Sequence, residues 1–197
     1  GGLVSEAIDM ANFFLPKGSL VISTKGRTVK DKEYITSAEG EFTKCKVVIL
    51  IDEFSASASE IVAGAIQDWD RGVIVGRRSF GKGLVQQQHM LVDGSAVNIT
   101  VAKYLTPSGR AIQRPYTQGD KKGDKQELVE RIANDKDTKQ GAESLRHKKL
   151  RLGKEVYGGG GIYPDYYVHN DTTENSKYLT DLLRKGIFFE FSTSYLD

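Results

Sequence analysis

The fold is decided by residues 46–76, which read KVVILIDEFSASASEIVAGAIQDWDRGVIVG. Residues 46–52 form a continuous aliphatic run, which is typical of a strand buried on both faces. Apolar residues between positions 61 and 69 recur at helical spacing, and residues 72–76 indicate a second buried strand. Strand, helix and strand within about 30 residues predict a βαβ unit with parallel strands and a right-handed crossover.

Apolar spacing and turn residues predict the elements around this unit. Residues 3–14 present one apolar face at helical spacing, and Pro16 and Gly18 should end that helix. Asp93-Gly94 is a strong two-residue turn signal between two strand-like segments. The other expected elements are strands at 19–24, 34–36 and 166–168, hairpin arms at 84–92 and 95–105, a loop at 106–113, a glycine-rich turn at 157–161 and a closing helix at 176–188.

Residues 117–155 differ from the rest of the chain. Lys, Arg, Asp and Glu dominate this segment, and apolar positions are sparse. We interpret it as a charged surface insertion, partly helical around 126–133, with a partner-binding site as the alternative. The whole chain, 1–197, is then one α/β domain carrying this insertion.

Composition narrows the class of protein. The 197 residues carry 28 Lys+Arg and 26 Asp+Glu, a net charge of +2, and 39% of them are hydrophobic. These values fit a globular chain and give no reason to expect nucleic acid as the partner. The longest strictly apolar run, 47–51, is far below the roughly 20 residues that span a bilayer. The single cysteine, Cys45, excludes an internal disulfide framework and a multi-cysteine zinc site, and we expect it to be a buried small apolar residue.

The chain opens with Gly1-Gly2-Leu3 and enters a helical pattern at once. Domains seldom begin inside their own packing, so we expect an N-terminally truncated fragment. The missing signal peptide therefore says nothing about where the full-length protein resides.

Residue types suited to catalysis are concentrated in residues 52–61, DEFSASASEI, between the first buried strand and the helix. Small side chains leave backbone N–H groups open there, and the helix dipole favours developing negative charge. A serine at this junction could attack a carbonyl while a neighbouring amide holds the oxyanion. The alternative is structural, because Ser57-Ala58-Ser59-Glu60 also fits a capping box. From these residues alone, it stays open whether any of the three serines is reactive, and which one.

A reactive serine needs a base, and the sequence offers Lys82. The three histidines, His89, His147 and His169, lie in no recognisable triad motif, and the G-x-S-x-G elbow is missing. Lys82 follows the second strand of the βαβ unit, so its loop should emerge beside the serine loop at the carboxyl ends of adjacent strands. A solvated loop lysine is the alternative.

Residues 76–82 also match the first part of a phosphate-binding P-loop, G-x-x-x-x-G-K. The next residue is Gly83 where Ser or Thr should bind magnesium, and a hairpin rather than a helix is expected to follow. We therefore set nucleotide binding aside.

Taken together, the sequence resembles the C-terminal processing peptidases, or tail-specific proteases, which are Ser/Lys serine proteases. The stretches that carry the resemblance run in order through nearly the whole chain apart from the charged insertion; they are 1–3, 47–65, 80–86, 104–113 and 160–165. Five motifs in order are highly specific.

The resemblance implies a role for particular residues. Ser57 corresponds to the family's nucleophile, Lys82 to its base, and Gln86 to a glutamine that orients the lysine. The oxyanion-hole amides correspond to Ala58 and to Gly1 or Gly2, most closely Gly2. No metal or cofactor is implied. For Lys82 to act as a base it should be largely buried, against Phe80 and the 73–75 strand, without a carboxylate partner.

The resemblance also implies properties of the whole protein. These are a ClpP/crotonase-like core of ββα units, substrates bound through their C-terminal tails, and an extracytoplasmic location in the periplasm or cell envelope of a bacterium. Family members carry a PDZ domain before the Gly-Gly turn, and we expect this fragment to lack it. The oligomeric state stays open. Two other functions compete: a non-catalytic binding or scaffold member of the fold, and acyl-CoA chemistry on a crotonase-like fold without a nucleophilic serine.

Overall fold

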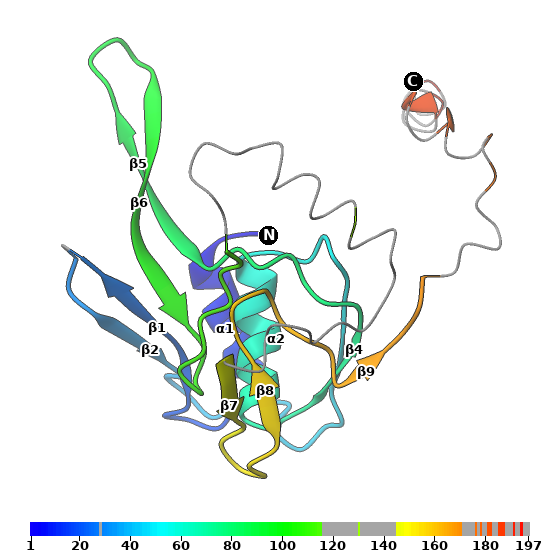
Figure 1. Cartoon of the computed structure of the whole chain (residues 1–197). Helices are drawn as coiled ribbons and strands as arrows, with labels where there is room; N and C mark the ends of the chain where they lie inside the picture. Colours follow the sequence, from blue (N-terminus) through cyan, green and yellow to red (C-terminus); the bar gives the residue numbers. More distant parts are fainter. Residues whose placement is uncertain are drawn as a thin grey trace.

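The structure is a computed structural model of the whole chain. It describes residues 1–115 except 28, residues 145–170, and isolated positions at 130 and between 176 and 194. Two helices lie side by side at the centre, with β-strands on either side of them (Figure 1). Within the described residues no helix is both long and apolar enough to cross a membrane.

The first helix, α1, spans Val4–Phe14 and ends where the sequence predicts. Leu15 is its extended C-cap, and Gly18, at φ +80°, completes the turn after Pro16. The chain then forms β1 (Leu20–Gly26), which pairs antiparallel with β2 (Lys32–Ile35). Both strands lie close to their predicted positions.

The predicted βαβ unit is confirmed. Strand β3 (Val48–Ile51) leads through α2 (Ala58–Asp68) to β4 (Val73–Gly76), and β3 and β4 pair in parallel. A short strand, β9 (Tyr166–Tyr167), adds in parallel on the far side of β4. The loops after β3 and β4 therefore leave the sheet at the same edge, as the sequence analysis expects.

Strand β3 is not buried on both faces, contrary to the prediction. Ile51 points into the core, but Val48 is 61% exposed and Leu50 78% exposed. Helix α2 packs on one face of this sheet, with α1 packed against α2, and no described residue covers these side chains on the other face. The prediction failed because an unbroken apolar run reports the chemistry of a strand, whereas its burial depends on which other elements reach it.

The second hairpin projects from the body of the molecule (Figure 1). It consists of β5 (Leu84–Met90) and β6 (Ala96–Leu105), which extend the first sheet in the order β2-β1-β6-β5. Its connection is a three-residue loop rather than the predicted two-residue turn, because the Leu91 N–H bonds the Ser95 carbonyl at 2.7 Å. Gly94, at φ +83°, supplies the left-handed residue that this longer loop needs.

The predicted charged insertion is only partly a surface arm. Its last residues form a hairpin of β7 (Arg146–Lys148) and β8 (Glu155–Tyr157) attached to the body. Lys149 is buried there, 7% exposed, although it lies in a run of charged residues. The expected helix at 126–133 lies outside the described residues except for position 130, which is helical and exposed. The expected helix at 176–188 also lies largely outside them.

Cys45 is exposed rather than buried, so that prediction is wrong. It follows a turn in which its N–H bonds the Phe42 carbonyl, and this turn lies outside the sheet. The main core is formed by α1, α2 and the inner faces of the sheets; its buried apolar members include Ala11, Leu15, Ile22, Ile61, Ile66, Ile74, Tyr104 and Ile162.

Candidate active site

Ser57 occupies a strained turn between β3 and α2. It is the N-cap residue of α2, with φ +58° and ψ −116°, a conformation that few non-glycine residues adopt. Such strain costs about 1–3 kcal/mol and clusters at active sites. A strand-to-helix turn of this kind is also the geometry of a nucleophile elbow. The two positions where G-x-S-x-G has its glycines are Ser55 and Ser59 here, which is why the sequence motif misses this serine.

The two neighbouring serines have ordinary surroundings. The Ser55 hydroxyl donates to Asp52 Oδ1 at 2.9 Å, in a turn where Asp52 also accepts backbone N–H bonds. The Ser59 hydroxyl accepts a bond from the N-terminal amine of Gly1 at 3.3 Å. Of the three serines, only Ser57 has the strained backbone.

Glu60 connects the serine loop to the lysine loop. Its side chain is fully buried, yet no cation pairs with it among the described residues. Oxygen Oε2 accepts the Ser57 N–H at 2.8 Å and the Lys82 N–H at 2.9 Å. Oxygen Oε1 accepts the Gly81 N–H at 2.7 Å and the Ser79 hydroxyl at 2.5 Å. One carboxylate therefore holds the backbones of residues 57 and 82 next to each other.

The capping box predicted as the structural alternative is present as well. The box pairs the Glu60 side chain with the Ser57 N–H, at 2.8 Å, and the Ser57 side chain with the Glu60 N–H. Capping and reactivity do not exclude each other here, because a hydroxyl that accepts a hydrogen bond keeps its own proton and can still give it to a base.

The Lys82 side chain is exposed, so the expectation that it is buried is wrong. The backbone of Lys82 is fixed by Glu60, but the rest of the residue leaves the loop toward solvent. No hydrogen bond joins Lys82 Nζ to the Ser57 hydroxyl, and no described carboxylate forms an ion pair with it. The structure thus brings the two loops together without bringing the two reactive groups into contact.

Two backbone donors lie beside Ser57. Ala58 is the first residue of α2, and its N–H has no hydrogen-bond partner among the described residues. Gly2 has φ +146°, which favours glycine, and a Cβ placed there would lie 3.6 Å from Ala58 Cβ. The predicted Gly1-Gly2 turn and Ala58 are therefore neighbours at the N-terminus of the helix.

Tyr104 is a further residue of this site, to which the sequence alone gives no role. It is 1% exposed, and its hydroxyl donates to the Lys82 carbonyl. Burial raises the pKa of the Tyr104 hydroxyl, as does the charge of Glu60, while a hydrogen bond with the Ser57 side chain lowers it. The only sequence signal was its place at the start of the matching stretch 104–113.

Comparison with known proteins identifies the family at this point. Residues 1–122 match the family described as "Peptidase family S41". The chain belongs to peptidase family S41. It is 34% identical over 190 residues to a probable CtpA-like serine protease of Staphylococcus aureus strain MRSA252, covering 93% of this chain and 36% of that protein. A probable CtpA-like serine protease of Staphylococcus haemolyticus strain JCSC1435 is 33% identical over 188 residues, covering 94% of this chain and 36% of that protein. The chain thus spans about a third of these relatives' length.

Solved structures agree with the S41 assignment. A photosystem II D1 C-terminal processing protease is 36% identical, with a TM-score of 0.53, over 57% of this chain and 29% of that one. A putative S41 protease from Bacteroides fragilis covers 95% of this chain and 42% of its own at a TM-score of 0.54. At 11% identity that second likeness shows the mixed α/β fold alone.

The last predicted site residue of this S41 chain, Gln86, lies on β5 opposite Thr100. Its side chain is exposed and makes no hydrogen bond to Lys82. The structure therefore does not place Gln86 against the lysine that it is expected to orient.

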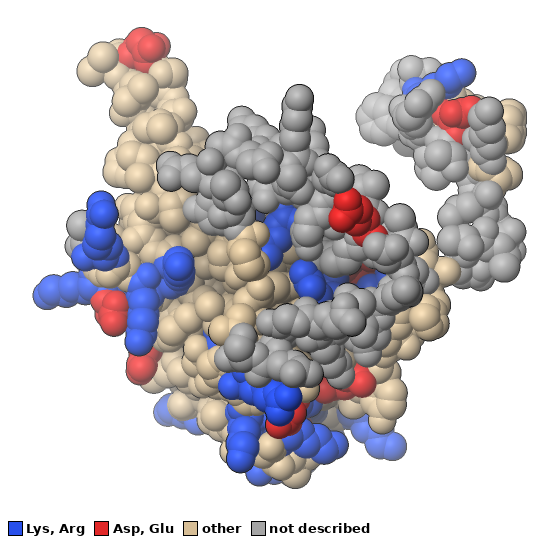
Figure 2. Space-filling model, viewed as in Figure 1, with Lys and Arg blue, Asp and Glu red and all other residues tan. Residues whose placement is uncertain are grey.

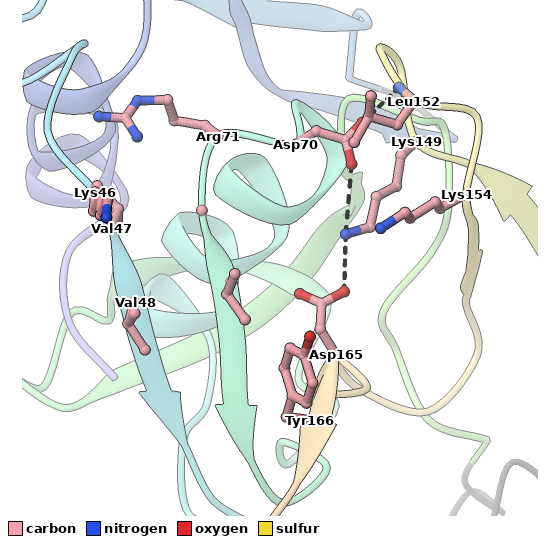
Figure 3. A pocket seen from close by; sticks show the side chains of 12 residues that line it. Lys46, Val47, Val48, Asp70, Arg71, Lys149, Leu152, Lys154, Asp165 and Tyr166 are labelled. Carbon is pink, nitrogen blue, oxygen red and sulfur yellow. Dashed lines mark hydrogen bonds and ion pairs between the residues drawn. The ribbon is translucent and has the colours of Figure 1, made fainter.

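A cavity of about 630 Å³ lies at the opposite end of the parallel strands. Figure 3 shows Lys149 there between two carboxylates, with Nζ 2.8 Å from Asp165 Oδ1 and 3.6 Å from Asp70 Oδ1. Lys46 and Val73 line it at the amino ends of β3 and β4. Because Ser57 and Lys82 follow the carboxyl ends of these strands, this cavity is not part of their site.

Proposed function

We propose that this chain is the catalytic domain of a serine peptidase that cleaves polypeptides through an acyl-enzyme, with Ser57 as nucleophile and Lys82 as base. The observation that carries the proposal is the junction at Glu60, which holds a strained serine beside the backbone of the only lysine of the neighbouring loop. Membership of peptidase family S41 supports it.

In the proposed reaction, Ser57 Oγ attacks the scissile carbonyl and Lys82 accepts the hydroxyl proton. The unpaired N–H of Ala58, together with that of Gly2, stabilises the oxyanion at the positive end of α2. Lys82 then donates the proton to the leaving amine. Water, activated by the same lysine, attacks the acyl-enzyme and releases the second product.

This scheme requires the Lys82 side chain to turn from solvent toward Ser57. A lysine amine in water is protonated at neutral pH and cannot accept a proton. Next to Ser57 the amine would leave water and lie near the buried Glu60, whose two oxygens already accept four hydrogen bonds from neutral donors. We propose that substrate binding closes the site by this movement, with Gln86 then orienting the amine.

The proposal also includes the fold superfamily, the cleavage position, the mode of substrate recognition and the location that the family resemblance implies. They are a ClpP/crotonase-like core over residues 1–197, cleavage near substrate C-termini, recognition of substrate tails by a PDZ domain of the whole protein, and an extracytoplasmic location. The similarity to CtpA-like and D1 C-terminal processing proteases supports them.

Covalent labelling of Ser57 tests the proposal. The chain is treated with a fluorophosphonate and digested, and adducts are located by mass spectrometry. We expect an adduct on Ser57 alone, lost in Ser57→Ala and at least about 10³-fold slower in Lys82→Ala. The matched variants Ser55→Ala and Ser59→Ala should keep it.

Two outcomes would contradict the proposal. Absence of an adduct on Ser57 at all pH values would favour a non-catalytic binding member of the fold. Thioester turnover that survives Ser57→Ala would favour acyl-CoA chemistry instead.

A further inference from the structure

Strand β5 is a free sheet edge of unusual length for this chain. It spans seven residues, Leu84–Met90, at the end of the order β2-β1-β6-β5. Strand β1 supports the hairpin only at its base, where it pairs with Ala102–Leu105 of β6. Beyond that point the hairpin is a two-stranded ribbon, and among the described residues only β6 hydrogen-bonds to the backbone of β5. Isolated two-stranded ribbons are marginally stable in water.

The hairpin lacks the usual protection of a free edge. Proteins guard such edges with Lys, Pro or very short strands. Between residues 84 and 102 the only charged side chain is Asp93, although 27% of the chain is charged. The ribbon accordingly carries no Lys or Arg along its length in Figure 2, and acidic atoms appear only at its tip. Met90 is 69% exposed and Ile99 47% exposed, so apolar side chains also face solvent.

This edge begins at the candidate active site. Leu84 follows Lys82 by two positions, and the N–H groups of Lys82 and Ser57 bond the same oxygen of Glu60. One residue of extended chain spans about 3.3 Å, so the first rung of β5 lies within a few residue lengths of Ser57. The other edge strands of the described residues are shorter: β2 and β3 have four residues each, β7 and β8 three each and β9 two. Strand β2 also carries Lys32 and Glu33.

We propose that the outer edge of β5, Leu84–Met90, binds an extended, uncharged segment of the polypeptide substrate as an added β-strand that leads the scissile bond to Ser57. The inference rests on the proposed function and adds a substrate class to it. Main-chain hydrogen bonds supply the affinity in this mode of recognition, and alternate side chains meet the apolar and glutamine surface of the ribbon. The strand itself, residues 84–90, has no Lys, Arg, Asp or Glu, so it offers no ion pair to a charged substrate segment of either sign.

The binding test uses the Ser57→Ala chain, which cannot cleave, and a fluorescent decapeptide of Ala, Val, Thr and Gln followed by anisotropy. Two further peptides carry N-methyl groups on the odd or on the even amides. A paired strand uses alternate amides on one edge. We therefore expect one N-methyl set to weaken binding at least about 10-fold and the other to change it less than about 2-fold. Equal binding of all three peptides would overturn the proposal.

Proline variants at neighbouring positions locate the edge. The N–H groups of Gln87 and Gln88 point to opposite edges of β5, one toward β6 and one outward. Proline at the outward position removes a donor to the peptide but no ladder bond. We expect one of Gln87→Pro and Gln88→Pro to keep the thermal midpoint and lose peptide binding about 10-fold. If that stable variant binds as well as the parent, the proposal is wrong.

Photo-crosslinking decides the question if both proline variants are destabilised. A benzophenone-bearing copy of the same peptide should form adducts within residues 84–90. Adducts confined to β2 or β3, or a dimer in sedimentation that buries β5 and excludes the peptide, would overturn the inference. Failure of the proposed function looks different, because it removes the fluorophosphonate adduct on Ser57 without changing peptide binding.

Discussion

A buried ionisable side chain lies near each end of the parallel strands β3 and β4: Glu60 at the carboxyl ends and Lys149 at the amino ends. The two side chains have opposite kinds of hydrogen-bond partner. At the carboxyl ends, Glu60 is surrounded by neutral donors: three backbone N–H groups and one hydroxyl. At the amino ends, Lys149 is held by the carboxylates of Asp70 and Asp165 (Figure 3). Because Glu60 bonds only neutral donors, no ion pair forms near Lys82 among the described residues. The ion pairs of Lys149 with Asp70 and Asp165 instead attach the loop of the β7–β8 hairpin to the body of the molecule. The comparison separates a charge that organises a reactive site from one that stabilises a fold.

Replacing Glu60 should have the largest effect, on activity and stability together. Glu60→Gln keeps the shape, but its amide group must face at least one N–H donor. We expect about 2–3 kcal/mol lower free energy of unfolding and a loss of at least about 100-fold in peptide cleavage. Chemical denaturation and kcat/KM measure the two. A Glu60→Gln variant with unchanged stability and full activity would contradict the claim that Glu60 organises the reactive site.

Replacing Lys149 should affect stability alone. Lys149→Ala leaves Asp70 and Asp165 without their cation, so we expect a loss of about 3 kcal/mol in the free energy of unfolding. The rate of Ser57 labelling in the folded fraction should stay within about 2-fold of the parent, measured well below the midpoint of the variant. A much larger loss of labelling would mean that the two ends are coupled.

Removing the Tyr104 hydroxyl should have a smaller effect at the carboxyl end. In Tyr104→Phe the Lys82 carbonyl loses its hydrogen-bond donor. We expect about 1 kcal/mol lower stability and about a 10-fold lower kcat with little change in KM. A change in KM alone would indicate that the tyrosine contacts substrate instead.

The smallest effect concerns alkaline pH. Because burial raises the pKa of Tyr104, the unfolded chain loses this proton first, and stability from this group is present below about pH 10 and falls above it. Tyr104→Phe lacks the group, so its stability should decline less between pH 9 and 11 than that of the parent. Denaturation curves of the parent and of Tyr104→Phe are measured at each pH. The difference between the two removes the contribution of the other titrating groups. Parallel declines would contradict the pKa direction.

Local patterns predicted the backbone of the fold well. The spacing of apolar residues in 3–14 and 46–76 fixed both helices and the parallel pair, because these patterns record which side of an element faces a core. Exposure was predicted poorly. Leu50 and Lys149 have side chains whose burial depends on contacts with distant segments, and no local pattern reports those contacts.

The candidate site divides in the same way. The junction of strand and helix located the three serines, the resemblance singled out Ser57 among them, and parallel pairing brought the Lys82 loop to it. The capping box predicted the contact between Ser57 and Glu60. The strained φ of Ser57, the three other donors of Glu60 and the position of Tyr104 were not predictable, because each depends on contacts between segments more than 15 residues apart or on a backbone angle. The exposed side chain of Lys82 was mispredicted, since the resemblance supplies a role for the residue but not its side-chain conformation.

A crystal structure of the chain with a peptide aldehyde on Ser57 tests the central claim most directly. We predict a hemiacetal on Ser57 Oγ, Lys82 Nζ within about 3.2 Å of that oxygen, and Glu60 still accepting the N–H groups of both residues. A hemiacetal with Lys82 left in solvent and another group serving as the base would contradict the account.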